Sequence, residues 1–322
     1  MRVLVYGAGV IGCFLAHTLC EAGQDVTLLA RGAWKDELRE QGLVIEHRLQ
    51  KKTTTDHPAV IGALDEARYD AVFAVMQHQQ MKTILPELAR VDSPLVVLVG
   101  NNLSAPEMER EILAHTAVPK TVLFGFQGTG GRRESGKVIC VRFGGGSMSL
   151  GGLGGEPEDA VKKTVQALFA GTKYSLTWIS NMDAWLHCHL AFILPVAYLC
   201  YITGCDLRRA ARRQRGLVLD AAGEGDKLLK ALGYPMAPEG EDTWYRPGPK
   251  RLLMRAMVFV MAKTALGDLA ASDHCRHAVI ELEGLDAAWD ELRGQRRELP
   301  MPAWDELRGA MPDWGTLHRL YG

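Results

Sequence analysis

The chain opens with the stretch VLVYGAGVIG at residues 3–12, in which four β-forming residues run directly into a Gly-x-Gly-x-x-Gly sequence. A segment with helical spacing of apolar residues follows it. In this setting Gly7 permits a tight turn, Gly9 lets a diphosphate approach the backbone, and Gly12 permits close packing of a helix whose N-terminus faces the anion. The alternative is a purely structural glycine turn. A second strand at residues 26–30 follows at the distance expected of a dinucleotide-binding βαβ unit, which favours the dinucleotide interpretation.

The end of that second strand indicates which dinucleotide is bound. An NAD site usually places a carboxylate there for the ribose 2′-hydroxyl, whereas this sequence has Ala30, Arg31 and Gly32. A guanidinium can pair with the 2′-phosphate of NADP(H) instead. We therefore expect NADP(H) as the cofactor and Arg31 as its 2′-phosphate ligand. The alternative for Arg31 is a solvated surface arginine.

The first half of the chain alternates strand and helix patterns, which predicts a doubly wound, Rossmann-type α/β domain at residues 1–172. Its parallel strands are expected at Val3–Tyr6, Asp25–Ala30, Tyr69–Val75 and Pro94–Val99. A later group, separated by glycine-rich turns, is expected to add mixed or antiparallel edge strands at Thr121–Phe126, Lys137–Arg142 and Ser147–Leu150.

Residues 173–322 are predicted to form an all-helical domain for substrate binding or dimerisation, after one more strand-like run at Tyr174–Ile179. Its helices are expected at Met182–Ile202, Asp206–Leu232, Lys250–Leu269 and His274–Arg293. The tail is too rich in proline for one long helix, and Trp304 and Trp314 indicate that it docks on another part of the protein.

The composition narrows the class of protein. The chain has 322 residues, of which 47% are hydrophobic, and its formal net charge of −1 offers no electrostatic footprint for nucleic acid or an anionic membrane. The expected partner is a small molecule. Seven cysteines without a CxxC pair are typical of a reducing cytoplasm. The apolar run Leu190–Ile202 is interrupted by Pro195 and is shorter than the roughly 20 residues that span a bilayer, so we expect a buried core helix or the face of a homodimer.

Three features together resemble the ketopantoate reductase family. They are the Gly7-x-Gly9-x-x-Gly12 loop, the end of the second strand at residues 28–32, and Asn101 after the apolar run at residues 94–100. The resemblance continues more loosely into the second half, where Ala184-Trp185 opens a long helix and residues 273–284 look like the family's last substrate-side helix. It implies reduction of a 2-oxo acid by NADPH, with the substrate held between two domains.

The sequence departs from the family at several substrate-side positions. Where the family has a proton-donating lysine and two asparagines at helical spacing, this chain has His187, Ala191 and Pro195. A second family lysine is matched by Gln77, whereas Asn101 persists. The resemblance implies that Gln77 and Asn101 lie at the cofactor and that Asn101 also takes part in catalysis. Glu281 and Glu283 are alternative counterparts of the family's substrate-binding glutamate.

His187 is the candidate proton donor. Hydride reduction of a carbonyl creates an alkoxide, and an imidazolium can protonate it near neutral pH. Asp183 lies four residues earlier on the same helix face and could orient the ring. The alternative is a surface or partly buried histidine without a chemical role. His274, His277 and Glu281 also share one predicted face, which we interpret as a solvated polar face rather than a metal site.

These observations predict an NADPH-dependent reductase of a small 2-oxo acid. The alternative is a non-catalytic NADP(H)-binding protein that kept the fold and lost the acid, because a fold by itself does not guarantee chemistry.

Overall fold

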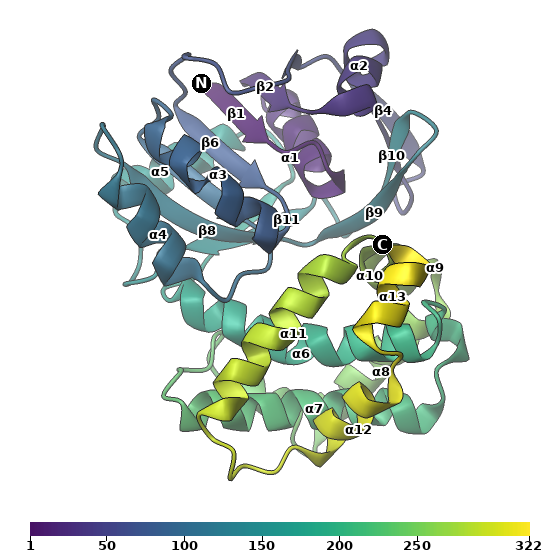
Figure 1. Ribbon diagram of the computed structural model, residues 1–322. Helices are drawn as coiled ribbons and strands as arrows, with labels where there is room; N and C mark the ends of the chain where they lie inside the picture. Colours follow the sequence, from purple (N-terminus) through teal and green to yellow (C-terminus); the bar gives the residue numbers. More distant parts are fainter. The chain divides into compact units, whose positions relative to one another are not determined.

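The chain divides into two compact units, Met1–Met182 and Asp183–Gly322 (Figure 1). The structure is a computed structural model that describes residues 1–322, the side chain of residue 265 excepted. The division falls ten residues after the expected boundary at 172/173. The reason is that the last strand, at Ser175–Trp178, pairs with a strand of the first unit.

The first unit is built on an eight-stranded sheet in the order β12-β11-β8-β7-β6-β1-β2-β5. Its strands are β1 (Arg2–Tyr6), β2 (Asp25–Leu29), β5 (Ala59–Ile61), β6 (Ala71–Val75), β7 (Leu95–Val99), β8 (Thr121–Gln127), β11 (Ser147–Gly151) and β12 (Ser175–Trp178). The central strands are parallel, β6 and β7 are fully buried, and the chain order reverses at β1, which confirms the predicted Rossmann-type domain.

The sequence prediction for the later strands is corrected in two places. β8 is an interior strand that runs parallel to β7, rather than an edge strand. β11 pairs with β8 in antiparallel orientation, as expected, but β10 (Lys137–Arg142) does not belong to this sheet.

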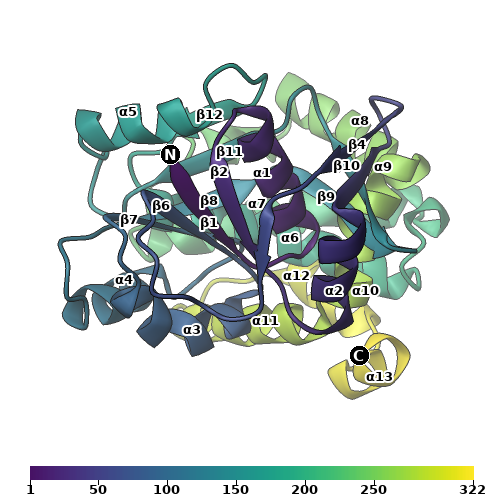
Figure 2. The same cartoon turned by 90° about the horizontal axis from the view of Figure 1, so that it is seen from above.

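Helices cover both faces of the main sheet. They are α1 (Val10–Glu21), α2 (Gly32–Gln41), α3 (His78–Arg90), α4 (Ala105–Ala114) and α5 (Asp159–Leu168). Figure 2 shows α1 and α5 on one face and α3 and α4 on the other. This arrangement follows from right-handed crossovers that leave β1 in opposite directions along the sheet.

A second sheet, absent from the sequence prediction, has the order β4-β3-β10-β9. Its members are β3 (Leu43–His47), β4 (Lys52–Asp56), β9 (Thr129–Glu134) and β10. It packs against α1, where the Arg142 guanidinium lies 4.9 Å from the centre of the Phe14 ring and His17 Nδ1 lies 2.7 Å from an Asp56 carboxylate oxygen. With a sheet on each side, residues 12–19 of α1 are all buried.

The second unit is helical, as predicted, although its helices break at different places. The long helices are α6 (Met182–Ile202), α7 (Arg212–Ala231), α8 (Pro249–Lys263) and α11 (Val279–Gly294). Shorter ones are α9 (Ala265–Gly267), a π-helical turn (Asp268–Ser272), α10 (Asp273–His277), α12 (Pro302–Ala310), α13 (Trp314–Tyr321) and two 3₁₀ turns (Leu207–Arg209 and Glu241–Trp244). The expected helix at 250–269 therefore ends at Lys263, and the expected helix at 274–293 is interrupted at Ala278.

The core of this unit is aromatic. The Trp289 and Trp304 rings are buried and stack with centroids 4.9 Å apart, and Tyr198 meets Trp304 edge to face at 5.7 Å. Trp304 belongs to the proline-rich tail, so the tail docks on its own unit through α12 and α13.

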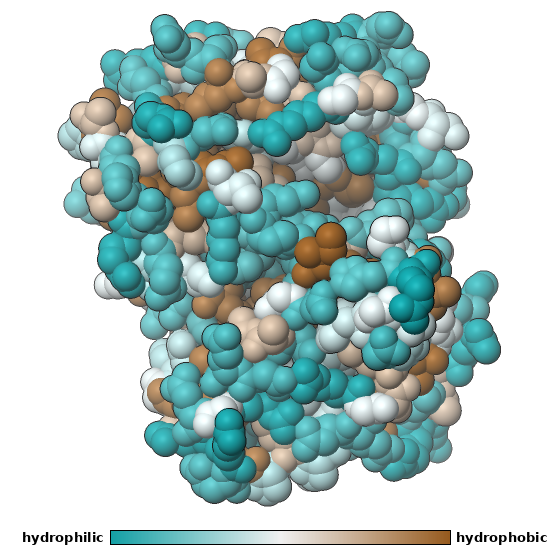
Figure 3. Space-filling view, viewed as in Figure 1, coloured by the Kyte–Doolittle hydropathy of each residue, from teal (hydrophilic) through white to brown (hydrophobic). Residues whose placement is uncertain are grey.

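Among the described helices, only α6 is long and apolar enough to cross a membrane. Of its most apolar stretch, 72% is buried inside the structure. This degree of burial is typical of a core helix. On the face shown in Figure 3 hydrophilic residues predominate, and hydrophobic residues form small, separate patches.

Candidate functional site

The glycine loop after β1 has two glycines that the protein itself requires. Gly7 has a φ of +122°, and a Cβ there would lie 2.2 Å from the Val75 carbonyl oxygen. A Cβ on Gly12 would lie 1.9 Å from the Gly7 carbonyl oxygen. Both positions are therefore closed to any other residue by neighbouring backbone.

Gly9 differs from its two neighbours in the motif. Its φ of −73° is open to any L-residue, and a Cβ there would meet no heavy atom within 4 Å. Neither the backbone conformation nor the packing of the protein requires glycine at this position. What the missing side chain leaves is open space directly at the N-terminus of α1, where a diphosphate would approach.

The N-terminus of α1 presents free amide donors to that space. Gly9 is the N-cap and supplies no side-chain acceptor, and the first intrahelical bond runs from Cys13 N to Gly9 O at 2.9 Å. The amides of residues 10–12 thus have no partner within the helix. The loop is fixed by Gly7 N, which donates to Leu29 O at 3.2 Å, and by Trp34 Nε1, which donates to Ala8 O at 2.9 Å.

Arg31 stands at the end of β2, as the N-cap of α2, and is exposed. Its guanidinium donates to the Tyr6 hydroxyl at 2.8 Å, and this hydroxyl donates to a Glu87 carboxylate oxygen at 2.7 Å. Burial, and then the hydrogen bond to Glu87, raise the pKa of Tyr6 to about 12, so the phenol stays protonated. Sequence reasoning missed Tyr6 and Glu87, since nothing in a tyrosine at a strand end or a glutamate 81 residues later indicates that they meet.

Gln77 and Asn101 follow β6 and β7, so the structure places both at the carboxyl edge of the sheet near the glycine loop. Gln77 is the N-cap of α3, and its Oε1 accepts from Gln79 Nε2 at 2.8 Å. Gly100, with a φ of +147°, brings the two loops so close that a Cβ there would lie 2.9 Å from Met76 O.

The Asn101 side chain borders a small hollow between these two loops. The side chain is 8% exposed, and its Oδ1 accepts no hydrogen bond from any described residue. A buried amide oxygen without a partner is uncommon, because its desolvation is uncompensated. The hollow is lined by Met76, His78, Met81, Leu98, Val99, Gly100, Asn101 and Asn102.

Two neighbours of Asn101 that the sequence analysis did not single out have structural contacts. Asn102 Oδ1 accepts from Ser104 N at 2.7 Å and so shapes the start of α4. Burial, with a smaller effect of the Lys82 charge, lowers the pKa of His78 to about 4. His78 is therefore neutral at the edge of the hollow near pH 7.

His187 lies on α6 in the second unit and is 3% exposed, so it is not a surface histidine. Its Nδ1 lies 2.8 Å from the Asp183 carbonyl oxygen and 3.5 Å from the Asp183 carboxylate, and its ring stacks on Tyr234 at 4.3 Å. Because a carbonyl only accepts, Nδ1 carries a proton. A proton donated by His187 would have to leave from Nε2 of an imidazolium, and its role as the acid stays a prediction.

The two positions that continue the His187 stripe are part of the packing. Ala191 is buried, and its Cβ would lie 2.9 Å from a Cβ on Gly225 of α7. Pro195 lies inside α6. The absence of a side chain at Gly225 thus makes room for the methyl group of Ala191.

The predicted polar stripe of His274, His277 and Glu281 is solvated only in part, since His277 is exposed. The helix breaks at Ala278, and Glu281 is buried with its carboxylate 3.6 Å from His274 Nε2. Among the residues that the structure describes, no group of three or more His, Cys, Asp or Glu could hold a metal ion.

Asp226 on α7 is a second polar group that the sequence analysis missed. Its side chain is 1% exposed, and neither carboxylate oxygen has a hydrogen-bond partner among the described residues. Burial, and then the charges of Glu241 and Asp242, raise the pKa of Asp226 to about 7. No sequence pattern marks it, because the aspartate takes an ordinary place in a helix.

The sequence is similar to that of known oxidoreductases over part of its length. A family described as Ketopantoate reductase PanE/ApbA matches residues 3–155. The chain is 30% identical over 88 residues to the uncharacterized oxidoreductase YkpB of Bacillus subtilis, and 36% identical over 62 residues to the 2-dehydropantoate 2-reductase of Pyrococcus horikoshii. These matches cover 27% and 18% of this chain, and 28% and 21% of the two relatives.

Solved structures match over nearly the whole length. The 2-dehydropantoate 2-reductase of Geobacter metallireducens has a TM-score of 0.71 at 18% identity and covers 96% of this chain and 98% of its own. D-mandelate dehydrogenase with NADH and anilino(oxo)acetate has a TM-score of 0.72 at 17% identity, covering 100% and 98%. A dimeric ketopantoate reductase from Staphylococcus aureus has a TM-score of 0.65 at 12% identity, covering 100% and 99%.

At such identities the structural likeness shows the fold alone, and the sequence match to the family is confined to residues 3–155. The chain therefore resembles the ketopantoate reductase family in sequence over residues 3–155 and shares the fold of solved ketopantoate reductases over nearly its whole length.

Proposed function

We propose that this protein is an NADPH-dependent reductase of a small 2-oxo acid. The observation that supports this most directly is Gly9, a glycine that the protein does not need for its own packing, at the donor-rich start of α1. A diphosphate accepts hydrogen bonds from such amides and is attracted by the positive end of the helix dipole. The residues present therefore fit a dinucleotide.

Arg31 supports NADP(H) over NAD(H). β2 ends without a carboxylate, and Arg31 stands beside the N-terminus of α2, which has no side-chain cap. A guanidinium next to uncapped amides suits the 2′-phosphate that distinguishes the two cofactors. D-mandelate dehydrogenase, which shares the fold, binds NADH, so the fold does not decide between them.

Bound NADPH would supply the hydride, and the residues of this chain would bind, orient and protonate. The amides of residues 10–12 would hold the diphosphate, and Arg31 the 2′-phosphate. The Asn101 amide oxygen, which has no hydrogen-bond partner among the described residues, would accept a hydrogen bond from the cofactor or substrate. His187 would donate a proton from Nε2 to the carbonyl oxygen, with Nδ1 held by Asp183.

The decisive experiment follows the loss of NADPH absorbance with a panel of 2-oxo acids, ketopantoate included. We expect turnover with at least one of them, and His187→Ala should abolish it while leaving the affinity for NADPH intact. Tight NADPH binding without turnover on the whole panel would contradict the reductase and favour the non-catalytic NADP(H)-binding protein. Unchanged turnover in His187→Ala would exclude His187 as the donor.

We also propose that the protein works in a reducing compartment and forms a homodimer. The seven cysteines carry free thiols, and six are buried, which supports a reducing compartment such as the cytoplasm. A homodimer is supported by the dimeric ketopantoate reductase of the same fold. Sedimentation at two protein concentrations would test whether the homodimer forms.

A further inference from the structure

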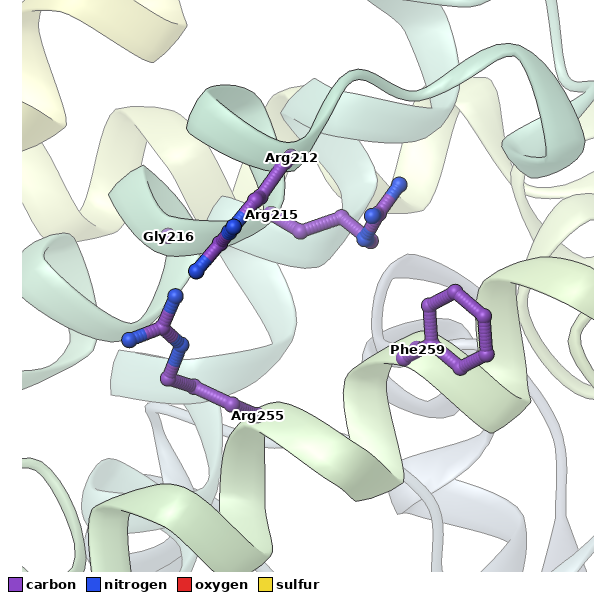
Figure 4. A pocket seen from close by; sticks show the side chains of 5 residues that line it. All are labelled: Arg212, Arg215, Gly216, Arg255 and Phe259. Carbon is purple, nitrogen blue, oxygen red and sulfur yellow. The ribbon is translucent and has the colours of Figure 1, made fainter.

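A cavity of about 270 Å³ opens between α7 and α8 in the second unit. It is lined by Arg212, Arg215, Gly216, Arg255 and Phe259 (Figure 4). Three of these five residues are cations and none is an acid. Such a concentration of one charge is unfavourable unless something compensates it.

The guanidinium groups of Arg212 and Arg255 point toward one another across this cavity (Figure 4). Neither forms a hydrogen bond or an ion pair within the part of the chain that the structure describes. Nearby arginines are compensated, since Arg213 pairs with Glu306 and Arg251 pairs with Asp220 at 2.7 Å. The cavity thus holds two converging guanidiniums without a counter-charge.

Arg215 adds a third positive charge that is held in place. Its Nη1 donates to the Ala210 carbonyl oxygen, and its guanidinium lies 5.4 Å from the centre of the Phe259 ring. A guanidinium over an aromatic face at this distance makes a favourable cation–π contact. The Arg215 side chain therefore needs little ordering on binding of an anion.

Gly216 leaves the cavity open on the α7 side. A Cβ there would meet no heavy atom within 4 Å, whereas a Cβ on Gly223 would lie 3.1 Å from Tyr245 Cβ and one on Gly225 would lie 2.9 Å from Ala191 Cβ. Packing accounts for the other two glycines of this helix but not for Gly216. Because glycine weakens a helix relative to alanine, its presence at the cavity wall points to a need for free space there.

We propose that this cavity, the arginine pocket, binds the phosphoryl group of a phosphate monoester with an apolar part. The planar forks of Arg212 and Arg255 match phosphate oxygens, and two or three guanidiniums balance a dianion. Phe259, half exposed at 50%, lines the same cavity on the side of Arg215 and would contact the apolar part of the ligand (Figure 4). This site lies in the second unit and shares no residue with the proposed dinucleotide site.

The test measures binding of phenyl phosphate to the full chain by titration calorimetry, in an Arg31→Gln background so that the proposed 2′-phosphate site does not contribute. Arg212→Gln and Arg255→Gln should each weaken binding by about tenfold or more, because each removes a charged hydrogen bond. Arg213→Gln removes the same charge from the same helix outside the pocket, and it should leave affinity unchanged. Equal losses in all three variants would overturn the proposal.

Gly216→Ala provides a second and independent variant. Its methyl group would project into the cavity, so phenyl phosphate should bind more weakly although the helix melts at the same or a higher temperature. Undiminished binding in Gly216→Ala would contradict the role assigned to this glycine and to the pocket.

A lipid headgroup could supply the same phosphoryl chemistry, since Leu252 and Leu253 of α8 are exposed. Flotation with vesicles that contain phosphatidic acid separates the two sources. Flotation that depends on Arg255, without phenyl phosphate binding, would assign the pocket to a headgroup. If neither probe binds in a manner that depends on Arg212 and Arg255, the pocket is not a phosphoryl site.

Discussion

The carbonyl oxygen of Gly7 lies where a Cβ on Gly12 would come within 1.9 Å of it. These two glycines therefore form a backbone contact that fixes the start of α1 against the loop that precedes it. Gly9, between them in the sequence, makes no such contact. The three glycines of one motif thus divide into two that the fold requires and one whose missing side chain leaves open space.

This division predicts opposite behaviour for two single-methyl substitutions. Gly9→Ala should leave the free energy of unfolding within about 1 kcal/mol of the parent but weaken NADPH binding at least about tenfold, because the methyl group would occupy the diphosphate position. Gly12→Ala should destabilise the protein by about 2–4 kcal/mol through the clash with Gly7. Thermal denaturation and a fluorescence titration with NADPH measure both quantities. Tight NADPH binding by Gly9→Ala would argue against a dinucleotide at this loop.

Arg31→Gln should weaken NADPH binding by about 10- to 100-fold, since a charged hydrogen bond to phosphate contributes roughly 1.5–3 kcal/mol. NADH has no 2′-phosphate, so its affinity should hardly change. Arg39→Gln is the matched control, because Arg39 lies on the same helix and donates to the Val60 carbonyl oxygen. If NADH binds more tightly than NADPH to the parent protein, the assignment of NADP(H) is wrong.

Asn101 and Asn102 form a natural pair for separating function from stability. Asn101→Ala should lower kcat/KM by about tenfold or more. It should change stability little, because Asn101 Oδ1 accepts no hydrogen bond from any described residue. Asn102→Ala should destabilise by about 1 kcal/mol, since Asn102 Oδ1 accepts from Ser104 N. Steady-state kinetics and melting of both variants measure the contrast. Equal catalytic losses in the two would remove Asn101 from the proposed site.

Asp226 predicts a pH dependence of stability. Its pKa is about 7 in the folded protein, against about 3.9 in an unfolded chain, so between these values the folded state binds more protons. Stability should therefore fall as pH rises from about 4 to 7. Asp226→Asn removes this loss and should raise the free energy of unfolding at pH 8 by on the order of 2 kcal/mol, with little effect at pH 4. Denaturant melts at both pH values test it, and an equal effect at both would contradict the shifted pKa.

The parts of the fold that the sequence predicted are those with local signals. The apolar runs of β1, β2, β6 and β7, and the spacing of the glycines, lie in short contiguous stretches. The second sheet had no such signal, because β3 pairs with β10, more than 90 residues away, and both outer strands are polar. The break at Ala278 was also missed, since no glycine or proline marks it.

The candidate site likewise contains residues with a local sequence signal and residues that only tertiary packing brings together. Gly7, Gly9 and Gly12 share a motif of defined spacing and Arg31 follows at the end of the next strand, so sequence alone could single them out, and their roles toward a cofactor stay predictions. Tyr6–Glu87 and the buried carboxyl of Asp226 are products of tertiary packing, which spacing does not report. His187 is buried and its ring stacks on that of Tyr234, a residue of a different segment that spacing along the helix does not reveal.

The first helix is enclosed by a sheet on each side, and this has a kinetic consequence. The hydrogen-bonded amides of its buried turns should exchange with solvent only when the whole first unit opens, so the helix holds the unpaired amides of residues 10–12 in fixed positions before any ligand arrives. A ligand that binds at the N-terminus of α1 should therefore order almost no additional part of the protein. Its capture should then be governed by diffusion and orientation rather than by the folding of a loop.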